Sequence, residues 1–303
     1  MSSGHETLFL SPDPAHKSLT QGDYLKPETW QALNPELHIQ DQEFFRNPKI
    51  FNLDSQTAGT LNQLLKHEGY FQLSTPGWDF DVRLLAQAVN RICAAELQAP
   101  FAFIYDEFWL AFCQLHQILA SLLGGDYRYL PDFWVWRVDP ARDDSGWSPH
   151  RDKGHKSLLP DGSPKSLTVW IPLTVASPLN SCMYLVPAHR DPTYNTEQEK
   201  EHRFALPDIR ALPGQPGDAF FWNQAVLHWG SRSSRLSQEP RISMAFEFQR
   251  TDVAPFNEPL LDPLQVYSFN SRLRLIGKQV LQYQHMYALT PAQKAFAQSC
   301  LQA

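Results

Sequence analysis

The sequence predicts an α+β protein in which a double-stranded β-helix, a jelly-roll or cupin-like core, is buttressed by N- and C-terminal helices. Apolar residues recur at helical spacing over residues 54–125 and again over 251–303. Between these segments, over 126–250, the apolar pattern changes to alternation, as in 167–173 and 241–248, with turn residues between the runs. We therefore expect all 303 residues to form one domain.

The N-terminal part is expected to form an irregular arm followed by the helical buttress. Residues 1–53 are polar, contain prolines and show little periodicity, apart from one short helix predicted near 27–33. Asp54 is a candidate N-cap for the first buttress helix, and Gly69 is its stop signal. The last buttress helix is predicted to run without a break from about residue 106 to 123.

A long polar stretch over residues 187–212 interrupts the predicted core. Long loops in compact domains are usually functional or disordered, so a lid over an active site and a plain surface loop both remain open. The helices predicted after residue 250 would either buttress the sheet or form a dimer contact. Both a monomer and a homodimer therefore remain open.

Composition excludes several classes of partner. The net charge of −6 and the isoelectric point near 6.0 argue against nucleic-acid binding. The sequence has no run of basic residues for a membrane surface and no apolar stretch long enough to span one. The four cysteines are scattered, which argues against a disulfide framework. No signal-peptide pattern is recognisable, so we expect a cytoplasmic protein.

Three residues form a candidate metal site. His150 and Asp152 are two positions apart, so on an extended segment both side chains would lie on one face. His228, 76 residues after Asp152, follows an apolar run and a turn. Two imidazoles and one carboxylate on one face of an octahedral ion form the facial triad of non-haem Fe(II) oxygenases. A lone His-x-Asp is weak evidence, because a surface ion pair is the alternative.

Arg241 is the candidate for binding an organic acid co-substrate. A carboxylate is best held by a planar guanidinium on a rigid element. Arg232 and Arg235 lie in a serine-rich turn, whereas Arg241 begins an alternating strand and shares a face with Ser243 and Ala245. The alternative is a strand-edge arginine in a surface ion pair.

Residues 54–250 resemble the phytanoyl-CoA dioxygenase family of Fe(II)/2-oxoglutarate oxygenases. The matching segments occur in the family's order: Gly69-Tyr70-Phe71, His150-x-Asp152, Val169-Trp170-Ile171-Pro172-Leu173, Asn180, the turn at Val186-Pro187-Ala188-His189-Arg190, Gly217-Asp218, His228-Trp229-Gly230-Ser231 and Arg241. Ser181 replaces the usual glycine, and Ala188-His189 replaces Gly-Ser-His. These departures affect a turn and no expected ligand.

The resemblance implies a reaction and its cofactors. It implies an enzyme that hydroxylates an unactivated C–H bond of a small molecule with Fe(II) and O₂, while 2-oxoglutarate is decarboxylated to succinate and CO₂. The implied roles are Fe(II) binding by His150, Asp152 and His228, and co-substrate binding by Arg241, Ser231 and Trp170. Related halogenases have a small residue in place of the carboxylate, so Asp152 favours hydroxylation over halogenation. Desaturation, cyclisation and epoxidation remain open.

The substrate pocket is the least determined part of the sequence. Trp134 and Trp147 are candidates to line it, although core packing is the alternative. Arg142 and His155 are candidates for its rim. Basic residues near the mouth, among them Lys153, suggest an acidic group on the substrate. Two other classes also remain open: a cupin-type metal enzyme that is not an oxygenase, and a catalytically silent binding protein of the same fold.

Overall fold

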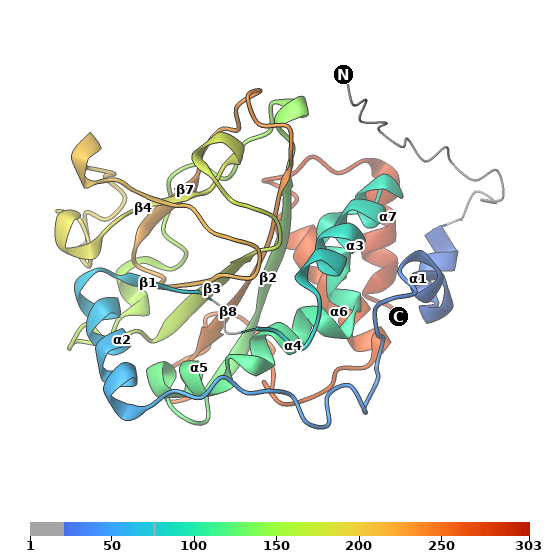
Figure 1. The fold of residues 1–303 in the computed structure, drawn as a ribbon, viewed down its shortest axis with the longest axis horizontal. Coiled ribbons are helices and arrows are strands. Elements are labelled where there is room, and N and C mark those ends of the chain that lie inside the picture. The colour runs from blue at the N-terminus through green and yellow to red at the C-terminus, as the bar shows by residue number, and fades with distance from the viewer. Residues whose placement is uncertain (1–20, 75–76) are drawn as a thin grey trace, which may run out of the picture.

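The computed structural model describes residues 21–74 and 77–303, and its elements are shown in Figure 1. The helices are α1 (Pro27–Leu33), α2 (Ser55–His67), α3 (Val82–Ala94), α4 (Asp106–Gln114), α5 (His116–Leu123), α6 (Phe269–Gln282) and α7 (Pro291–Cys300). The strands are β1 (Tyr70–Leu73), β2 (Arg128–Val138), β3 (Ser166–Pro172), β4 (Met183–Val186), β5 (Arg210–Leu212), β6 (Ala219–Asn223), β7 (Leu227–Gly230) and β8 (Arg241–Gln249). The first 20 residues of the predicted arm lie outside the described residues.

Two antiparallel sheets form the core that was predicted as a jelly roll. The larger sheet has the strand order β1-β6-β3-β8-β2, and the smaller one has the order β5-β4-β7. Alternation along β3 gives the larger sheet two different faces. Val169 packs into the core shared with the helices, whereas Trp170 packs with Leu185 of the smaller sheet. The α+β fold with a jelly-roll core is therefore confirmed.

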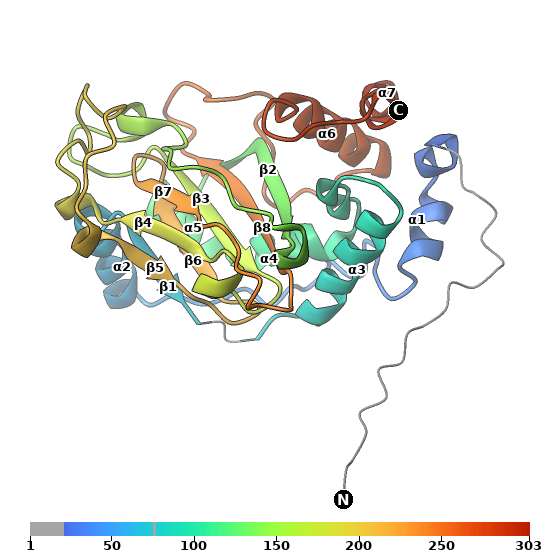
Figure 2. The same cartoon turned by 90° about the horizontal axis from the view of Figure 1, so that it is seen from above.

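Helices cover the outer face of the larger sheet. Figures 1 and 2 show α3, α4 and α6 along β2 and β8, with α2 and α5 at the other end of that sheet. Phe103, Phe112 and Phe246 belong to the large aromatic core between these helices and the sheet. Asp54 caps α2 by accepting a hydrogen bond from the Thr57 N–H at 2.9 Å, as predicted.

The prediction of one uninterrupted helix over residues 106–123 is wrong. The segment breaks at Leu115 into two helices, α4 and α5. The physical reason is a contact with the N-terminal arm. The backbone N–H of Phe51 donates to the carbonyl of Gln114 at 2.9 Å, and the Gln114 side chain donates to the Lys49 carbonyl at 2.8 Å. Apolar periodicity continues across the break, so it could not reveal this competing long-range hydrogen bond.

The segment over residues 187–212 differs from the prediction at its end. Its last three residues form β5, which pairs with β4 in the smaller sheet. The segment is also attached to the candidate metal loop. The Arg151 guanidinium donates to Asp191 Oδ2 at 2.6 Å and to Thr193 Oγ1 at 3.0 Å. The segment therefore contributes to the core and supports the loop that carries His150 and Asp152.

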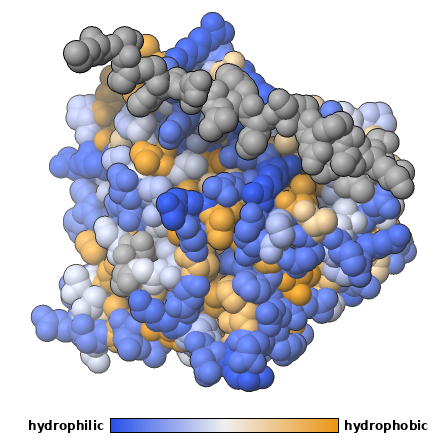
Figure 3. All heavy atoms as spheres, turned by 45° about the vertical axis from the view of Figure 1, so that its right-hand side comes forward, coloured by the Kyte–Doolittle hydropathy of each residue, from blue (hydrophilic) through white to orange (hydrophobic). Residues whose placement is uncertain are grey.

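The surface offers no membrane-spanning element in the part of the chain that the structure describes. None of those helices is both long and apolar enough to cross a bilayer. On the face shown in Figure 3, hydrophobic residues are interspersed among hydrophilic ones. Scattered apolar residues of this kind are normal for a protein surface.

A buried ion pair attaches α6 to α4, and its loss is expected to destabilise the fold. Arg272 Nη1 lies 2.5 Å from Asp106 Oδ1, and both side chains are fully buried. Asp106→Asn leaves the Arg272 charge uncompensated, so we expect the free energy of unfolding to fall by about 3–5 kcal/mol. Urea denaturation measures this change. The matched control, Asp252→Asn in the exposed pair with Arg250, should lower the free energy of unfolding far less; equal losses would contradict the prediction.

Candidate metal centre and its cavity

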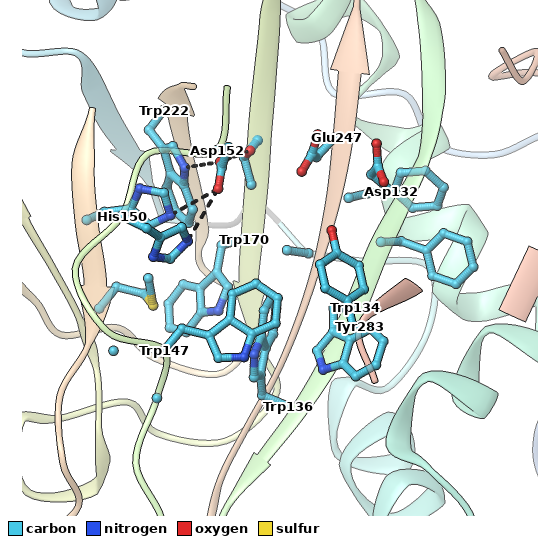
Figure 4. Close-up of a pocket in the computed structure, with 18 of the residues that line it drawn as sticks. Asp132, Trp134, Trp136, Trp147, His150, Asp152, Trp170, Trp222, Glu247 and Tyr283 are labelled. Atoms are coloured by element: carbon cyan, nitrogen blue, oxygen red, sulfur yellow. Dashed lines mark hydrogen bonds and ion pairs between the residues drawn. The ribbon is translucent and has the colours of Figure 1, made fainter. Parts of the chain in front are cut away.

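A cavity opens between the two sheets, and the predicted metal ligands lie in its wall. The space amounts to about 570 Å³, including the open mouth. Residues of β2, β3, β6, β7 and β8 line it, together with the loop that follows β2 (Figure 4). Figure 4 shows His150, Asp152 and Trp222 on one side of the cavity, with Glu247 and Asp132 on the other.

The structure brings His150, Asp152 and His228 together. One potential ligand atom from each residue lies within 4.8 Å of the others. Asp152 Oδ1 is 3.5 Å from His150 Nε2 and 3.4 Å from His228 Nε2. Two reciprocal backbone hydrogen bonds between His150 and His228, at 3.0 and 2.9 Å, hold the two chain segments side by side. These contacts explain how residues so distant in sequence share one site.

Both imidazoles have the tautomer that a metal ligand needs. His150 Nδ1 lies 2.7 Å from the Ser148 carbonyl oxygen, and His228 Nδ1 lies 3.1 Å from the Val226 carbonyl oxygen. A carbonyl only accepts hydrogen bonds, so Nδ1 carries the proton in each ring. The Nε2 atoms therefore face the shared space beside Asp152, where each could bind a metal ion once it has lost its proton. Such backbone contacts commonly orient metal-binding histidines.

The Asp152 carboxylate has one oxygen engaged and one free. Oδ2 accepts hydrogen bonds from Thr168 Oγ1 at 2.7 Å and from Trp222 Nε1 at 3.2 Å, while Oδ1 faces the two imidazoles. Burial by itself would raise the pKa of Asp152, but the charge of His228 and the hydrogen bond from His150 hold it well below its usual value. The group is therefore an ionised carboxylate with one oxygen available to a cation.

Burial and the same carboxylate act in opposite directions on His150. Burial alone would lower the pKa of His150, but its hydrogen bond to Asp152 and the negative charge there raise it. A cation placed among the three groups would take over the role of that proton. The chemistry of the donor set, two neutral nitrogens and one anionic oxygen, fits a divalent transition metal.

Thr168 and Trp222 are supports that the sequence interpretation did not single out. Thr168 was detectable, because it lies two positions before Trp170 on the same strand and must share its face. Trp222 could not be detected from the sequence, because its approach to Asp152 depends on the pairing of β3 with β6. That pairing places Thr168 opposite Trp222.

Removing one of these supports should weaken metal binding without removing a ligand. Thr168→Val keeps the shape of the side chain but loses the hydrogen bond to Asp152 Oδ2. We expect the affinity for Fe(II) to fall by about 10- to 100-fold, measured by anaerobic titration. Thr60→Val on the exposed surface of α2 is the matched control and should bind Fe(II) like the wild type. Wild-type affinity in Thr168→Val would contradict this role.

Arg241 is a buried cation that lines the same cavity. Its side chain is 1% exposed, and its guanidinium lies 5.7 Å from the Trp170 ring. Nε donates to the Ser181 carbonyl at 2.9 Å and Nη1 donates to Ser243 Oγ at 2.5 Å. Burial lowers the pKa of Arg241 to about 10. Within residues 21–74 and 77–303 no carboxylate pairs with it, so an anion entering the cavity would supply the missing charge.

The remaining predicted site residues divide into two groups. Trp134, Trp147 and Trp170 line the cavity, whereas Ser231, Arg142 and His155 do not. Ser231 immediately follows Gly230, the last residue of β7, which does line the cavity. The Arg142 side chain is 75% exposed. His155 Nδ1 lies 2.9 Å from Glu199 Oε1, outside the cavity.

A second histidine and glutamate cluster lies on the surface. His67, Glu68 and His189 also offer potential ligand atoms within 4.8 Å of one another. The two imidazoles are stacked with their ring centres 4.5 Å apart, and each lies near a Glu68 oxygen. None of these three residues lines the cavity that contains Arg241, so the cluster is not a candidate for the same chemistry.

Comparison with known proteins places this geometry in a family. Residues 85–242, just over half of the chain, match the phytanoyl-CoA dioxygenase (PhyH) family. No curated protein matches the sequence. A similar solved structure is the non-heme alpha ketoglutarate dependent epimerase SnoN from nogalamycin biosynthesis, with 17% identity, 68% of this chain and 94% of that chain covered, and a TM-score of 0.51.

Two further structures have the same fold. SnoN in complex with Fe3+, alpha ketoglutarate and nogalamycin RO has 18% identity, covers 71% of this chain and 96% of its own, and gives a TM-score of 0.51. HygX from Streptomyces hygroscopicus with nickel and 2-oxoglutarate has 15% identity, 69% and 91% coverage, and a TM-score of 0.50. At such identities the structural similarity concerns the fold, whereas the sequence match assigns the family. The chain belongs to the phytanoyl-CoA dioxygenase (PhyH) family, whose members are oxygenases that use Fe(II), 2-oxoglutarate and O₂.

Proposed function

We propose that this oxygenase hydroxylates an unactivated C–H bond of a small molecule, while 2-oxoglutarate is converted to succinate and CO₂. The observation that carries the proposal is the convergence of His150 Nε2, His228 Nε2 and one free oxygen of Asp152 in the wall of a cavity. Three protein ligands on one side of an octahedral ion leave three positions for co-substrate and O₂.

In this proposal the triad holds Fe(II), and Arg241 holds the far carboxylate of 2-oxoglutarate. Arg241 supports that role because it is a buried guanidinium on a rigid strand with no acidic partner among the described residues. Trp170 Nε1 is buried and has no hydrogen-bond partner there, so its N–H is available to the same ligand. The contacts from Ser181 and Ser243 fix the orientation of the guanidinium before the ligand arrives.

When bound, Fe(II) and 2-oxoglutarate supply the oxidising chemistry of the reaction. The chain supplies orientation and exclusion of water. Thr168 and Trp222 would keep one Asp152 oxygen directed at the ion, and the backbone carbonyls hold a proton on each Nδ1 so that each Nε2 faces the ion. Related halogenases have a small residue in place of this carboxylate, so the presence of Asp152 favours hydroxylation over halogenation.

Isotope labelling tests the proposed reaction. The iron-loaded protein is incubated with 2-oxoglutarate, ¹⁸O₂ and a panel of small molecules, and succinate and products are measured by mass spectrometry. We expect succinate formation that requires Fe(II) and is absent in His228→Ala, and a product carrying one ¹⁸O atom. A product that has lost two hydrogens would indicate desaturation instead. Equal succinate formation by the wild type and His228→Ala would contradict the proposal.

A further inference from the structure

Two carboxylates face the cavity at the end far from Arg241. Glu247 and Arg241 both project from β8 toward the cavity, and they lie six positions apart on the strand, or about 20 Å. Asp132 projects from the neighbouring strand β2 and also lines the cavity. Figure 4 shows both carboxylates across the cavity from Asp152. The proposed iron site therefore lies between a cationic end and an acidic end.

The two carboxylates share a single cation. Lys153 Nζ lies 3.0 Å from Glu247 Oε2 and 3.4 Å from Asp132 Oδ2. Asp132 Oδ1 also accepts hydrogen bonds from Asn257 and Gln282, both at 2.8 Å. Glu247 Oε2 is buried against the Lys153 ammonium, and the Glu247 side chain is 12% exposed. Both acids line the cavity but Lys153 does not, so an incoming ligand meets carboxylate oxygens.

The charges of a loaded site leave this end one positive charge short. Fe(II), Asp152, dianionic 2-oxoglutarate and Arg241 together sum to zero, whereas Asp132 and Glu247 exceed Lys153 by one negative charge. Burial raises the pKa of Glu247 to about 8 despite the nearby ammonium. When no ligand is bound, a proton on Glu247 therefore neutralises the charge that a second cation would otherwise balance.

Aromatic rings form the wall between the acidic end and the proposed iron site. The Trp147 ring centre lies 5.2 Å from that of Trp136, 5.4 Å from that of Tyr283 and 5.7 Å from that of His150. Trp134 lies 5.0 Å from Tyr283 and completes the wall. Faces of indole and phenol rings attract cations, and quaternary or alkylated ammonium groups are the ligands that such walls recognise best.

We propose that the substrate is an organic ammonium compound, bound with its cationic nitrogen against Glu247 and Asp132 and its apolar part along the Trp147 and Tyr283 rings. The inference rests on the proposed function, because this pose places a C–H bond of the apolar part beside the iron ligands. It replaces the acidic substrate group suggested by the sequence. Lys153 is occupied by two carboxylates, and Arg142 is exposed outside the cavity.

A matched pair of probes tests the charge preference directly. Choline and 3,3-dimethylbutan-1-ol have the same shape, but only choline is charged. Their dissociation constants are measured by anaerobic calorimetry on the wild-type protein loaded with Fe(II) and 2-oxoglutarate. We expect choline to bind at least about tenfold more tightly than the alcohol. Equal affinities, a preference for the alcohol, or no detectable choline binding would overturn the inference.

Two variants locate the preference within the cavity. Glu247→Gln should weaken choline binding by about tenfold and leave the alcohol unchanged, whereas Glu239→Gln, an exposed control just before β8, should change neither. Trp147→Leu keeps an apolar wall without a π face, so it should weaken choline more than the alcohol. A choline preference that survives both cavity variants would also overturn the inference.

The same experiment separates this inference from the proposed function. If 2-oxoglutarate binds to the iron-loaded protein but choline shows no advantage, the substrate class is wrong and the oxygenase proposal stands. If the protein does not assemble an iron and 2-oxoglutarate complex but the apo protein still binds choline more tightly than the alcohol, the proposed ligand roles fail and the cationic subsite stands.

Discussion

Asp152→Ala is expected to reduce the affinity for Fe(II) by more than about 100-fold and to abolish succinate formation. Loss of an outer support already costs about 10- to 100-fold in metal affinity, and this substitution removes the only anionic ligand of the proposed triad. It also leaves the hydrogen-bond donors of Thr168 and Trp222 without their acceptor. Anaerobic Fe(II) titration and a succinate assay measure the two effects.

The control for Asp152→Ala is Asp161→Ala, which removes an exposed aspartate from a surface turn. It should bind Fe(II) and form succinate as the wild type does. Circular dichroism of both variants establishes that they fold. A folded Asp152→Ala protein that retained wild-type iron affinity would show that Asp152 is not a ligand and that another donor completes the site.

Arg241→Ala is expected to weaken 2-oxoglutarate binding by roughly 30-fold or more, while Fe(II) binding changes little. Truncating one member of a buried, hydrogen-bonded charge pair costs about 2–5 kcal/mol. The guanidinium is fully enclosed, so no other described cation can replace it at the Trp170 side of the cavity. The dependence of succinate formation on 2-oxoglutarate concentration measures the loss.

Arg241→Lys and Arg235→Ala sharpen that result. Lysine keeps the charge but cannot reproduce the planar fork, so binding should recover only in part. Arg235, an exposed arginine in the preceding turn, should be replaceable without effect. If Arg241→Ala and Arg235→Ala bound 2-oxoglutarate equally well, Arg241 would not be the co-substrate residue.

Alternation and spacing were sufficient to predict the elements that carry the site. The pattern of β8 placed Arg241 on the face opposite Ile242, and the structure places Ile242 in the helix-facing core and Arg241 in the cavity. The order of the His-x-Asp pair, the apolar run and His228 likewise predicted segments that the structure brings together. Local periodicity placed the strands, and the resemblance to the phytanoyl-CoA dioxygenase family supported the choice of His228 and Arg241.

Other features of the site could not be predicted, because they depend on strand register and on contacts between distant segments. The apolar periodicity of a sequence contains no information about either. The sequence did not reveal the two carboxylate partners of Lys153, because they come from β2 and β8, far away in sequence. Lys153 therefore looked like a free cation that would bind an acidic substrate. Tyr283 follows α6 directly, and only packing of that helix beside β2 brings it to the cavity. Glu247 was detectable in principle, because alternation from Arg241 puts it on the same face.

The most direct test of the central claim is an anaerobic titration of Fe(II) and then 2-oxoglutarate into the apo protein, followed by visible absorption. Chelation of the ion by a 2-oxo acid gives a weak charge-transfer band. The account predicts this band in the wild type and its loss or weakening in Asp152→Ala and Arg241→Ala. A well-folded wild-type protein that shows no band would contradict the assignment of His150, Asp152 and His228 as an iron and 2-oxoglutarate site.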